Sequence, residues 1–412
     1  MLPRLPLFAA VLVLTLAAGC AQQPAFTRPP AAETVDDRAR ALTDRMLVVD
    51  GHIDVPYRLT EEPWADVGGS GVVADDTLGD FSFARARQGG LDAPFMSIYI
   101  PAAKQLVPGA AYAFADSLID LVETWTARHP DRFEIARRPA DIARIAAAGK
   151  VALPMGMENG APISSLGDLR HFFDRGIRYV TLTHGKVNQL GDASYDSVRT
   201  WRGLSPLGRE VVGEMNRLGM LVDISHVSDE TAFDVLRTSR APVIASHSSM
   251  RVFTPGWERN MSDSLARALA ANGGVVMINF GSAFLRTAYQ ARQTQFQIRL
   301  NNALRQQGLT PRDRASFPIY YAMRRAEPVG TLDDVADHID HAVRVMGAEH
   351  VGLGSDFDGV TSLPRGLTDV TGYPALVAEL LRRGYTESAV EGILGGNLLR
   401  VWREAERVAA AN

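Results

Sequence analysis

Eight short runs of apolar and β-branched residues place the strongest limit on how this 412-residue chain folds. Buried parallel strands have this composition, because helices cover both faces of a parallel sheet. The expected strands are residues 46–49, 95–100, 151–157, 179–183, 221–225, 243–246, 275–280 and 351–355. Between most of them, amphipathic helices are expected at residues 111–128, 166–175, 207–218, 229–238, 262–271 and 332–345.

Eight alternating strand and helix units predict an α/β fold in which the strands close a (β/α)8 TIM-like barrel. An open, doubly wound sheet is the rival architecture. Such a sheet usually has a glycine-rich turn, G-x-G-x-x-G, after its first strand, and none follows residues 46–49. The barrel is therefore expected as a single domain over residues 37–412.

The first twenty residues have a different character. Arg4 precedes an apolar stretch at residues 5–18, which is too short to span a bilayer comfortably and is typical of a signal peptide. Cys20, the single cysteine of the chain, follows Gly19 in a sequence that resembles a bacterial lipobox. We therefore expect a signal peptide at residues 1–19, a lipidated Cys20, and a Pro/Ala-rich tether to residue 36. Ala21 after the cysteine favours a lipid anchor in the outer membrane, facing the periplasm.

Polar residues that bind metals or transfer protons stand at or just after six of the eight expected strand ends. The carboxyl ends of barrel strands carry the active sites of this fold, so these side chains are expected to converge. Four of the nine histidines belong to the set, which is His52, Asp54, Glu158, His184, His226, His247 and Asp356.

Two parts of this set predict metal binding. His52 and Asp54 are two residues apart on an extended segment, so their side chains point to the same side and can reach one metal ion. His226 and His247 each follow an apolar strand and a serine, and two neutral imidazoles on adjacent strands suit zinc.

Glu158 ends a strongly apolar strand, where an unpaired carboxylate would be costly to bury. We expect it to bridge two metal ions, which would together acidify a shared water into a hydroxide nucleophile. Asp356 is expected to accept the proton of that hydroxide and to deliver a proton to the leaving group. An arginine partner for Glu158 is the alternative interpretation.

A second histidine pair, His338 and His341, also has a metal-like spacing beside Asp337 and Asp340. It falls inside the helix expected at residues 332–345, on the outer layer of the barrel. We interpret this segment as a solvated helix face.

Six motifs together resemble the membrane dipeptidase (renal dipeptidase) family of zinc metallopeptidases. The resemblance covers nearly the whole chain after the tether, and the motifs follow the family's order. They are DGHIDVP, GMENG, TLTHGKVN, VDISHVS, VIASHSS and GLGSDFDG.

The resemblance implies a binuclear zinc centre that hydrolyses free dipeptides to amino acids. His52 and Asp54 would bind one zinc ion, His226 and His247 the other, and Glu158 both. It further implies that His184 contacts the substrate and stabilises the oxyanion, and that Asp356 also holds the substrate amino group. Arg259 matches the family's arginine for the substrate carboxylate, with Arg251 as a nearby competitor. The family also suggests a homodimer.

Two other functions stay open at this point. A different metal-dependent barrel hydrolase, acting on a lactone or a cyclic amide, usually has His-x-His on its first strand, whereas this chain has His-x-Asp. A non-catalytic surface lipoprotein would be favoured if one of the expected metal-ligand residues were missing.

Nucleic-acid binding is not expected, because the net charge is -4 and the Lys and Arg residues are scattered. The polar stretch at residues 285–325 is either a lid or an oligomer contact.

Overall fold

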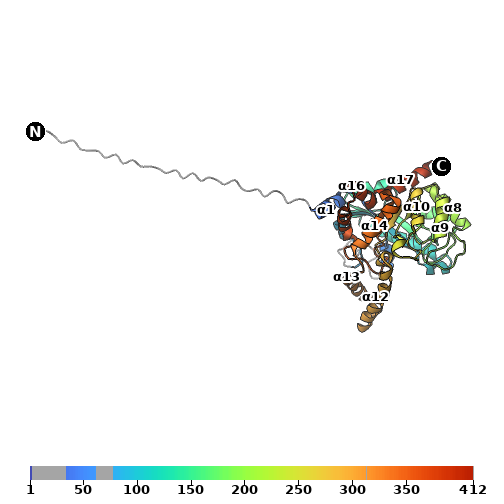
Figure 1. The fold of residues 1–412 in the computed structure, drawn as a ribbon. Helices are drawn as coiled ribbons and strands as arrows, with labels where there is room; N and C mark the ends of the chain where they lie inside the picture. The colour runs from blue at the N-terminus through green and yellow to red at the C-terminus, as the bar shows by residue number, and fades with distance from the viewer. Residues whose placement is uncertain (2–33, 62–77, 312, 412) are drawn as a thin grey trace. The chain divides into compact units, whose positions relative to one another are not determined.

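The computed structural model describes residue 1 and residues 34–61, 78–311 and 313–411 (Figure 1). Apart from Met1, the expected signal peptide lies outside these residues, as do Cys20 and nearly all of the tether. The described helices and strands belong to one compact unit, Val35–Asn412. Among the residues that the structure describes, no helix is both long enough and apolar enough to cross a membrane.

Eight parallel strands close a barrel, which confirms the expected fold class. Their order around the barrel is β1-β10-β9-β8-β7-β6-β5-β2. Because every pairing is parallel, all eight carboxyl ends meet at one end of the barrel. The strands are β1 (Val48–Ile53), β2 (Leu91–Tyr99), β5 (Met155–Glu158), β6 (Ile177–Thr181), β7 (Leu221–Asp223), β8 (Ile244–Ala245), β9 (Val275–Ile278) and β10 (Val351–Leu353).

The third expected strand, residues 151–157, is two strands rather than one. β4 (Val151–Ala152) pairs with β3 (Phe133–Glu134) in a separate two-stranded sheet, and only β5 enters the barrel. The break falls at Pro154, which has no backbone N–H to donate to a neighbouring strand. Its carbonyl oxygen instead accepts a hydrogen bond from the backbone N–H of Met96 at 2.8 Å.

Six helices agree with the expected ranges to within one residue at each end. They are α5 (Ala110–Arg128), α7 (Leu166–Asp174), α8 (Pro206–Leu218), α9 (Asp229–Thr238), α10 (Asp263–Ala271) and α14 (Leu332–Met346). A serine hydroxyl caps the first turn of α7, α8, α9 and α10, which explains where these helices begin. The other helices include α1 (Val35–Arg45), α2 (Val55–Glu61), α4 (Phe83–Gly89), α6 (Pro139–Ala147), α11 (Ser282–Leu285), α15 (Tyr373–Arg382), α16 (Glu387–Glu391) and α17 (Asn397–Ala410).

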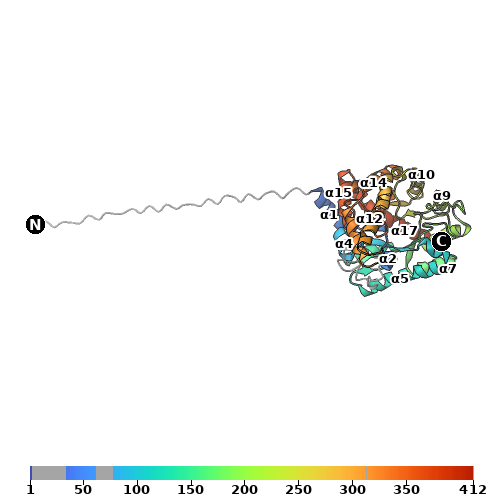
Figure 2. The same cartoon turned by 90° about the horizontal axis from the view of Figure 1, so that it is seen from below.

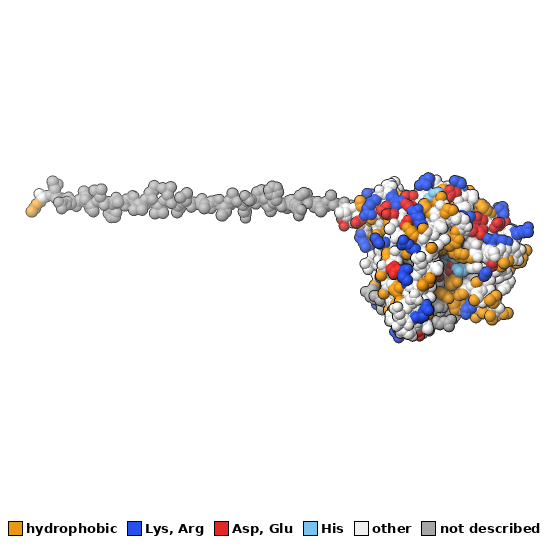
Figure 3. All heavy atoms as spheres, turned by 60° about the horizontal axis from the view of Figure 1, so that its bottom comes forward, with side chains coloured by type: hydrophobic (Ala, Val, Ile, Leu, Met, Phe, Trp, Pro, Cys, Tyr) orange, Lys and Arg blue, Asp and Glu red, His pale blue; other side chains and the backbone are white. Residues whose placement is uncertain are grey.

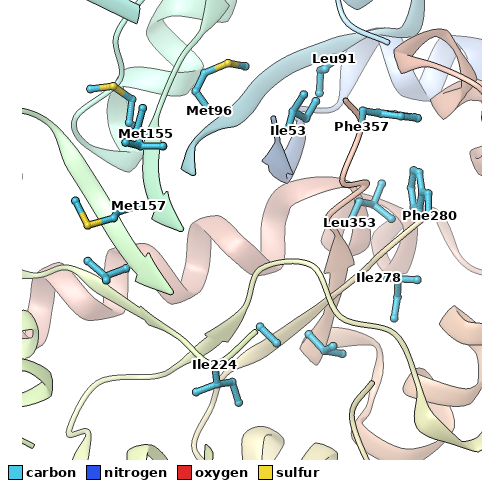
Figure 4. Packing of buried hydrophobic residues seen from close by; sticks show 14 of the residues in the cluster. Ile53, Leu91, Met96, Met155, Met157, Ile224, Ile278, Phe280, Leu353 and Phe357 are labelled. Atoms are coloured by element: carbon cyan, nitrogen blue, oxygen red, sulfur yellow. The ribbon is translucent and has the colours of Figure 1, made fainter. Parts of the chain in front are cut away.

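The helices surround the barrel (Figures 1 and 2), and apolar side chains fill the layer between them and the strands. Figure 4 shows members of this layer, among them Met96, Met155 and Ile278, on separate strands. A second cluster joins the barrel to α17, where Trp402 packs against Phe95 with ring centroids 5.4 Å apart. The barrel is therefore a packed core, and ligands are confined to its carboxyl end.

Two helices, α12 (Thr287–Gln306) and α13 (Ser316–Ala326), form a hairpin that stands away from the barrel (Figure 1). The hairpin has a small apolar cluster of its own, centred on Phe296, Leu300 and Leu304. Arg324 of α13 joins it to the barrel through a buried, two-bonded ion pair with Asp80, at 2.8 and 2.9 Å. On the face in Figure 3, acidic and basic side chains are interspersed.

Substitution by alanine is expected to have opposite effects on stability at Gly354 and at Gly213. A Cβ on Gly354 would lie 1.9 Å from the carbonyl oxygen of Ser246, so Gly354→Ala should lower the free energy of unfolding by at least about 1–3 kcal/mol. A Cβ on the exposed Gly213 of α8 meets nothing within 4 Å. Gly213→Ala should therefore raise the free energy of unfolding by about 0.5–1 kcal/mol. Urea unfolding measures both changes, and equal shifts would contradict this packing.

Candidate metal centre

All seven polar side chains singled out at the strand ends converge at the carboxyl end of the barrel. His52 lies within β1 and Asp54 just after it, while Glu158 is the last residue of β5. The others stand on the segments that follow β6, β7, β8 and β10, and they are His184, His226, His247 and Asp356. Their ligand atoms fall into three clusters, each with atoms within 4.8 Å of one another: His52, Glu158 and His247; Glu158, His184 and His226; and His52, Asp54 and Asp356.

Glu158 occupies the middle of the site. Its Oε2 is 3.4 Å from Nε2 of His52, on the β1 side. Its Oε1 is 3.1 Å from Nε2 of His226 and 3.2 Å from Nε2 of His247, on the β7 and β8 side. The two oxygens of one buried carboxylate therefore face two different groups of ligands. The alternative of an arginine partner for Glu158 is wrong, because histidines surround it.

Several buried atoms of the site make no hydrogen bond to any residue that the structure describes, so they test whether the site fits a metal ion. Nε2 of His52, Oδ1 of Asp54 and Nδ1 of His226 are in this condition. Nε2 of His226 and Nε2 of His247 face each other at only 2.8 Å. Imidazole nitrogens and carboxylate oxygens that converge without other partners are the donors that divalent transition metals prefer. The residues present therefore fit a metal centre.

The surroundings also set the charges of the ligands. Burial lowers the pKa of His226 and of His247 well below the usual value, which leaves neutral imidazoles suited to metal binding. Burial alone would raise the pKa of Glu158. The neighbouring His52 instead holds the pKa of that carboxyl well below its usual range, so Glu158 is an anion.

The pKa of Asp356 is shifted in the opposite direction to that of Glu158. Burial, and then the nearby carboxylate of Asp54, raise the pKa of Asp356 well above its usual value. Its Oδ2 accepts a 2.7 Å hydrogen bond from Nδ2 of Asn279, a residue after β9. Asp356 and His226 both have positive φ, at 62° and 68°, a strained backbone that turns the chain sharply after each strand.

The two candidate arginines have different environments. Arg251 makes a two-bonded ion pair with Asp229 at 2.6 and 2.7 Å. Arg259 is buried and donates to the hydroxyl of Ser248 at 2.8 Å and to the carbonyl oxygen of His247 at 2.7 Å. Its Nε has no hydrogen-bond partner in the described part of the chain. Of the two, only Arg259 lies against the metal ligands.

A cavity of about 360 Å³ opens onto the centre. Its wall includes ligand side chains such as Asp54 and Glu158, and also His184 and Asp356. Much of the rest is aromatic, with Tyr57, Tyr99, Tyr195, Trp257 and Phe284. Gln293 of the hairpin contributes to the same wall, so a segment far from the strands helps to shape the cavity.

The segment around His338 and His341 differs from the sequence expectation. His338 is fully buried rather than solvated: its Nδ1 accepts a bond from the backbone N–H of Met250, and its Nε2 donates to the carbonyl oxygen of Leu285. Burial lowers its pKa to about 4, so it is a neutral linker between segments. The spacing of apolar residues predicted the helix correctly, but it did not predict that α14 is packed deeply enough to bury His338.

Sequence reasoning missed the groups that support the ligands. Asp50, Asp223 and Tyr179 are fully buried next to ligand segments, and Asn279 binds Asp356. A signal for the two aspartates was present, since each interrupts an apolar strand where a carboxylate is costly to bury. No comparable signal marked Asn279.

The comparisons with known proteins agree with this geometry. The family model described as Membrane dipeptidase (Peptidase family M19) matches residues 36–412. Dipeptidase tcpJ of Claviceps purpurea (strain 20.1) is 35% identical over 343 residues, which cover 82% of this chain and 72% of the relative.

Two solved structures share the fold over most of the chain. The probable dipeptidase PvdM from Pseudomonas aeruginosa is 27% identical, with a TM-score of 0.76, over 91% of this chain and 99% of the other. A metallopeptidase from Rhodobacter sphaeroides, bound to a phosphinate mimic of the dipeptide L-Ala-D-Ala, is 27% identical, with a TM-score of 0.71, over 87% and 99%. The chain therefore belongs to the membrane dipeptidase family, peptidase family M19, and is a metal-dependent hydrolase of peptide bonds.

Proposed function

We propose that this enzyme hydrolyses free dipeptides with two zinc ions bridged by Glu158. His52 and Asp54 would hold one ion, and His226 and His247 the other. The observation that carries the proposal is the position of Glu158, whose Oε2 lies 3.4 Å from His52 and whose Oε1 lies 3.1 and 3.2 Å from His226 and His247. Two metal ions bound there would lower the pKa of a shared water to supply the nucleophile and would polarise the scissile carbonyl.

Asp356 is suited to carry the proton. Burial and the nearby carboxylate of Asp54 raise its pKa, which favours acceptance of a proton from the attacking water and its later release to the departing nitrogen. The bond from Asn279 to Oδ2 holds the carboxyl in one orientation at the cavity wall. Its position there also lets it receive the amino group of the substrate.

His184 is suited to stabilise the oxyanion. Its side chain lines the cavity, and its Nε2 is 3.7 Å from Oε1 of Glu158. Its ring packs against Tyr99, with the two ring centroids 4.7 Å apart. Burial lowers its pKa, so the imidazole stays neutral and donates a hydrogen bond without adding charge to the centre. A donor held in place before the reaction stabilises developing negative charge at little reorganisation cost.

Arg259 is proposed to bind the substrate carboxylate. Its guanidinium is held by Ser248 and by the backbone of His247, so its plane is set before substrate arrives. A planar guanidinium can bind both oxygens of a carboxylate. The dipeptide mimic bound by the Rhodobacter sphaeroides relative supports a substrate of this size, as does the 360 Å³ cavity.

Export and anchoring are proposed from the sequence. A signal peptide at residues 1–19 and a lipid on Cys20, followed by a tether to residue 36, would place the barrel at the outer membrane facing the periplasm. Assembly as a homodimer is proposed from the family resemblance.

Chelation should abolish the activity. A panel of free L,L and L,D dipeptides is assayed for amino-acid release before and after a chelator, and then after zinc is restored. We expect release that is lost with the chelator and regained with two zinc equivalents, because all the proposed chemistry depends on the ions. Zinc-loaded protein that cleaves a lactone or a cyclic amide but no dipeptide would overturn the substrate assignment.

Asp356→Asn should lower kcat by about 10²–10⁴-fold, because the amide cannot accept the proton. The amide can still bond to Asn279, so zinc content should stay at the wild-type level. Asn279→Ala is the matched variant, since it leaves the carboxyl but removes the bond that orients it, and it should lower kcat less. Wild-type kcat in Asp356→Asn would exclude the proton-transfer role.

Blocked substrates should be poor. An N-acetylated dipeptide lacks the amino group proposed to meet Asp356, and a C-terminal amide lacks the carboxylate proposed to meet Arg259. We expect kcat/KM to fall for both, and Arg259→Lys to reproduce the second loss with the free dipeptide, because lysine loses the planar, two-bonded contact. Equal kcat/KM for free and blocked dipeptides would contradict recognition of both substrate ends.

A further inference from the structure

A fully buried carboxylate lies beside the metal centre and contacts no cationic side chain among the described residues. Asp223 is the last residue of β7. Its Oδ1 accepts bonds from the backbone N–H groups of Ser225 and Ser246, at 3.0 and 2.8 Å. Its Oδ2 accepts bonds from the hydroxyls of Thr181 and Ser246, at 2.5 and 2.6 Å. All four donors are neutral, so hydrogen bonds alone offset the cost of burying this charge.

Ser246 connects this carboxylate to a proposed metal ligand. Its hydroxyl oxygen is 2.6 Å from Oδ2 of Asp223 and 2.7 Å from Nδ1 of His247. The strand register brings the parts together, because Glu158 pairs with Thr181, and Thr181 with Asp223, on adjacent strands. The carboxylate, the hydroxyl and the imidazole thus form one chain of hydrogen bonds that ends at the centre.

These hydrogen bonds determine which ring nitrogen of His247 carries the proton. A carboxylate accepts hydrogen bonds and cannot donate one, so the single hydroxyl hydrogen of Ser246 points to Asp223. The oxygen of Ser246 can then only accept from His247. Nδ1 of His247 is therefore protonated, and Nε2 carries the lone pair, which faces Oε1 of Glu158 at 3.2 Å.

The other two imidazoles of the proposed ligand set are held differently. Nδ1 of His52 is 2.8 Å from the hydroxyl of Tyr179, which donates to the carbonyl oxygen of Gly51 at 3.2 Å, so a neutral phenol orients that ring. Nδ1 of His226 makes no hydrogen bond with any of the described residues. Within the described residues, the carboxylate support is thus particular to His247.

We propose that Asp223 is a positioning residue that acts through Ser246 to hold His247 in the tautomer that binds the metal. This inference rests on the proposed use of His247 as a ligand. Partners that orient a ligating imidazole and raise its basicity typically change metal affinity or activity by about 10–100-fold. Asp223 would add this effect without touching the metal or the substrate.

Asp223→Asn tests the inference because it reverses the chain of hydrogen bonds. The amide oxygen can still accept the two backbone bonds at the Oδ1 position, which places the NH₂ group against Ser246 and Thr181. Ser246 then accepts from the amide and donates to Nδ1 of His247, which moves the ring proton to Nε2, the atom that faces the metal centre. A comparable reversal follows when an aspartate that orients a catalytic histidine becomes asparagine.

Two further variants separate this role from a structural one. Ser246→Ala removes the link between Asp223 and His247 and leaves the carboxylate in place. Thr181→Val is the matched control, since it removes the other hydroxyl bond to the same Oδ2 and leaves Ser246 and His247 connected. A structural role alone would make all three variants alike in zinc affinity and different only in the melting temperature of the metal-free protein.

Two readouts are measured on the purified protein. Zinc affinity is obtained by competition with a chromophoric chelator. The tautomer of His247 in the metal-free protein is obtained by nitrogen NMR with ¹⁵N-histidine, the signal being assigned by its loss in His247→Gln.

We expect an Nδ1–H tautomer in the wild type and in Thr181→Val, and an Nε2–H tautomer in Asp223→Asn. Zinc affinity should fall about 10–100-fold in Asp223→Asn and Ser246→Ala, and less than twofold in Thr181→Val.

An Nε2–H tautomer in the wild type would overturn the inference without any variant. Unchanged zinc affinity in Asp223→Asn and Ser246→Ala, with a wild type that binds zinc, would overturn it as well. A wild type that binds no zinc would instead refute the proposed metal centre, and that result is distinct because the tautomer is measured without metal.

Discussion

The site depends on one constraint, which is that the carboxylate of Glu158 is buried at the end of an apolar strand. A charge in that position must be surrounded by donors, and barrel geometry supplies them because all the strands end on the same side. His52, His226 and His247 meet the carboxylate from three different strands. The barrel therefore acts as a frame that brings ligands distant in the sequence to one carboxylate.

Much of the fold and most of the centre could be predicted because both depend on local patterns. Buried parallel strands are marked by apolar runs, and a ligand at a strand end needs only the residue that follows such a run. The six helices agreed to within one residue, and in four of them the serine that caps the first turn is also a local signal. Prediction was wrong where Pro154 split a strand and where α14 buried His338, because both outcomes depend on neighbouring segments.

The residues that support the ligands could not be predicted for a related reason. Asn279 supports Asp356 and Tyr179 supports His52, and both contacts join strands that are far apart in the sequence. Neither residue type is unusual after or within a strand, so no local pattern marks it. Asp50 and Asp223 are the exceptions, since a carboxylate inside an apolar run already requires an explanation.

The hairpin of α12 and α13 contributes to the wall of the cavity but supplies none of the proposed metal ligands. Every proposed metal ligand belongs to the barrel, while Gln293 of α12 forms part of the cavity wall. The hairpin is fastened by the buried pair of Arg324 and Asp80, and Asp80 in turn bonds to the backbone of Asp358, two residues beyond Asp356. Substitutions on the side of the hairpin that lines the cavity, where Gln293 lies, can thus change which substrate side chains fit, while the proposed metal ligands on the barrel stay in place.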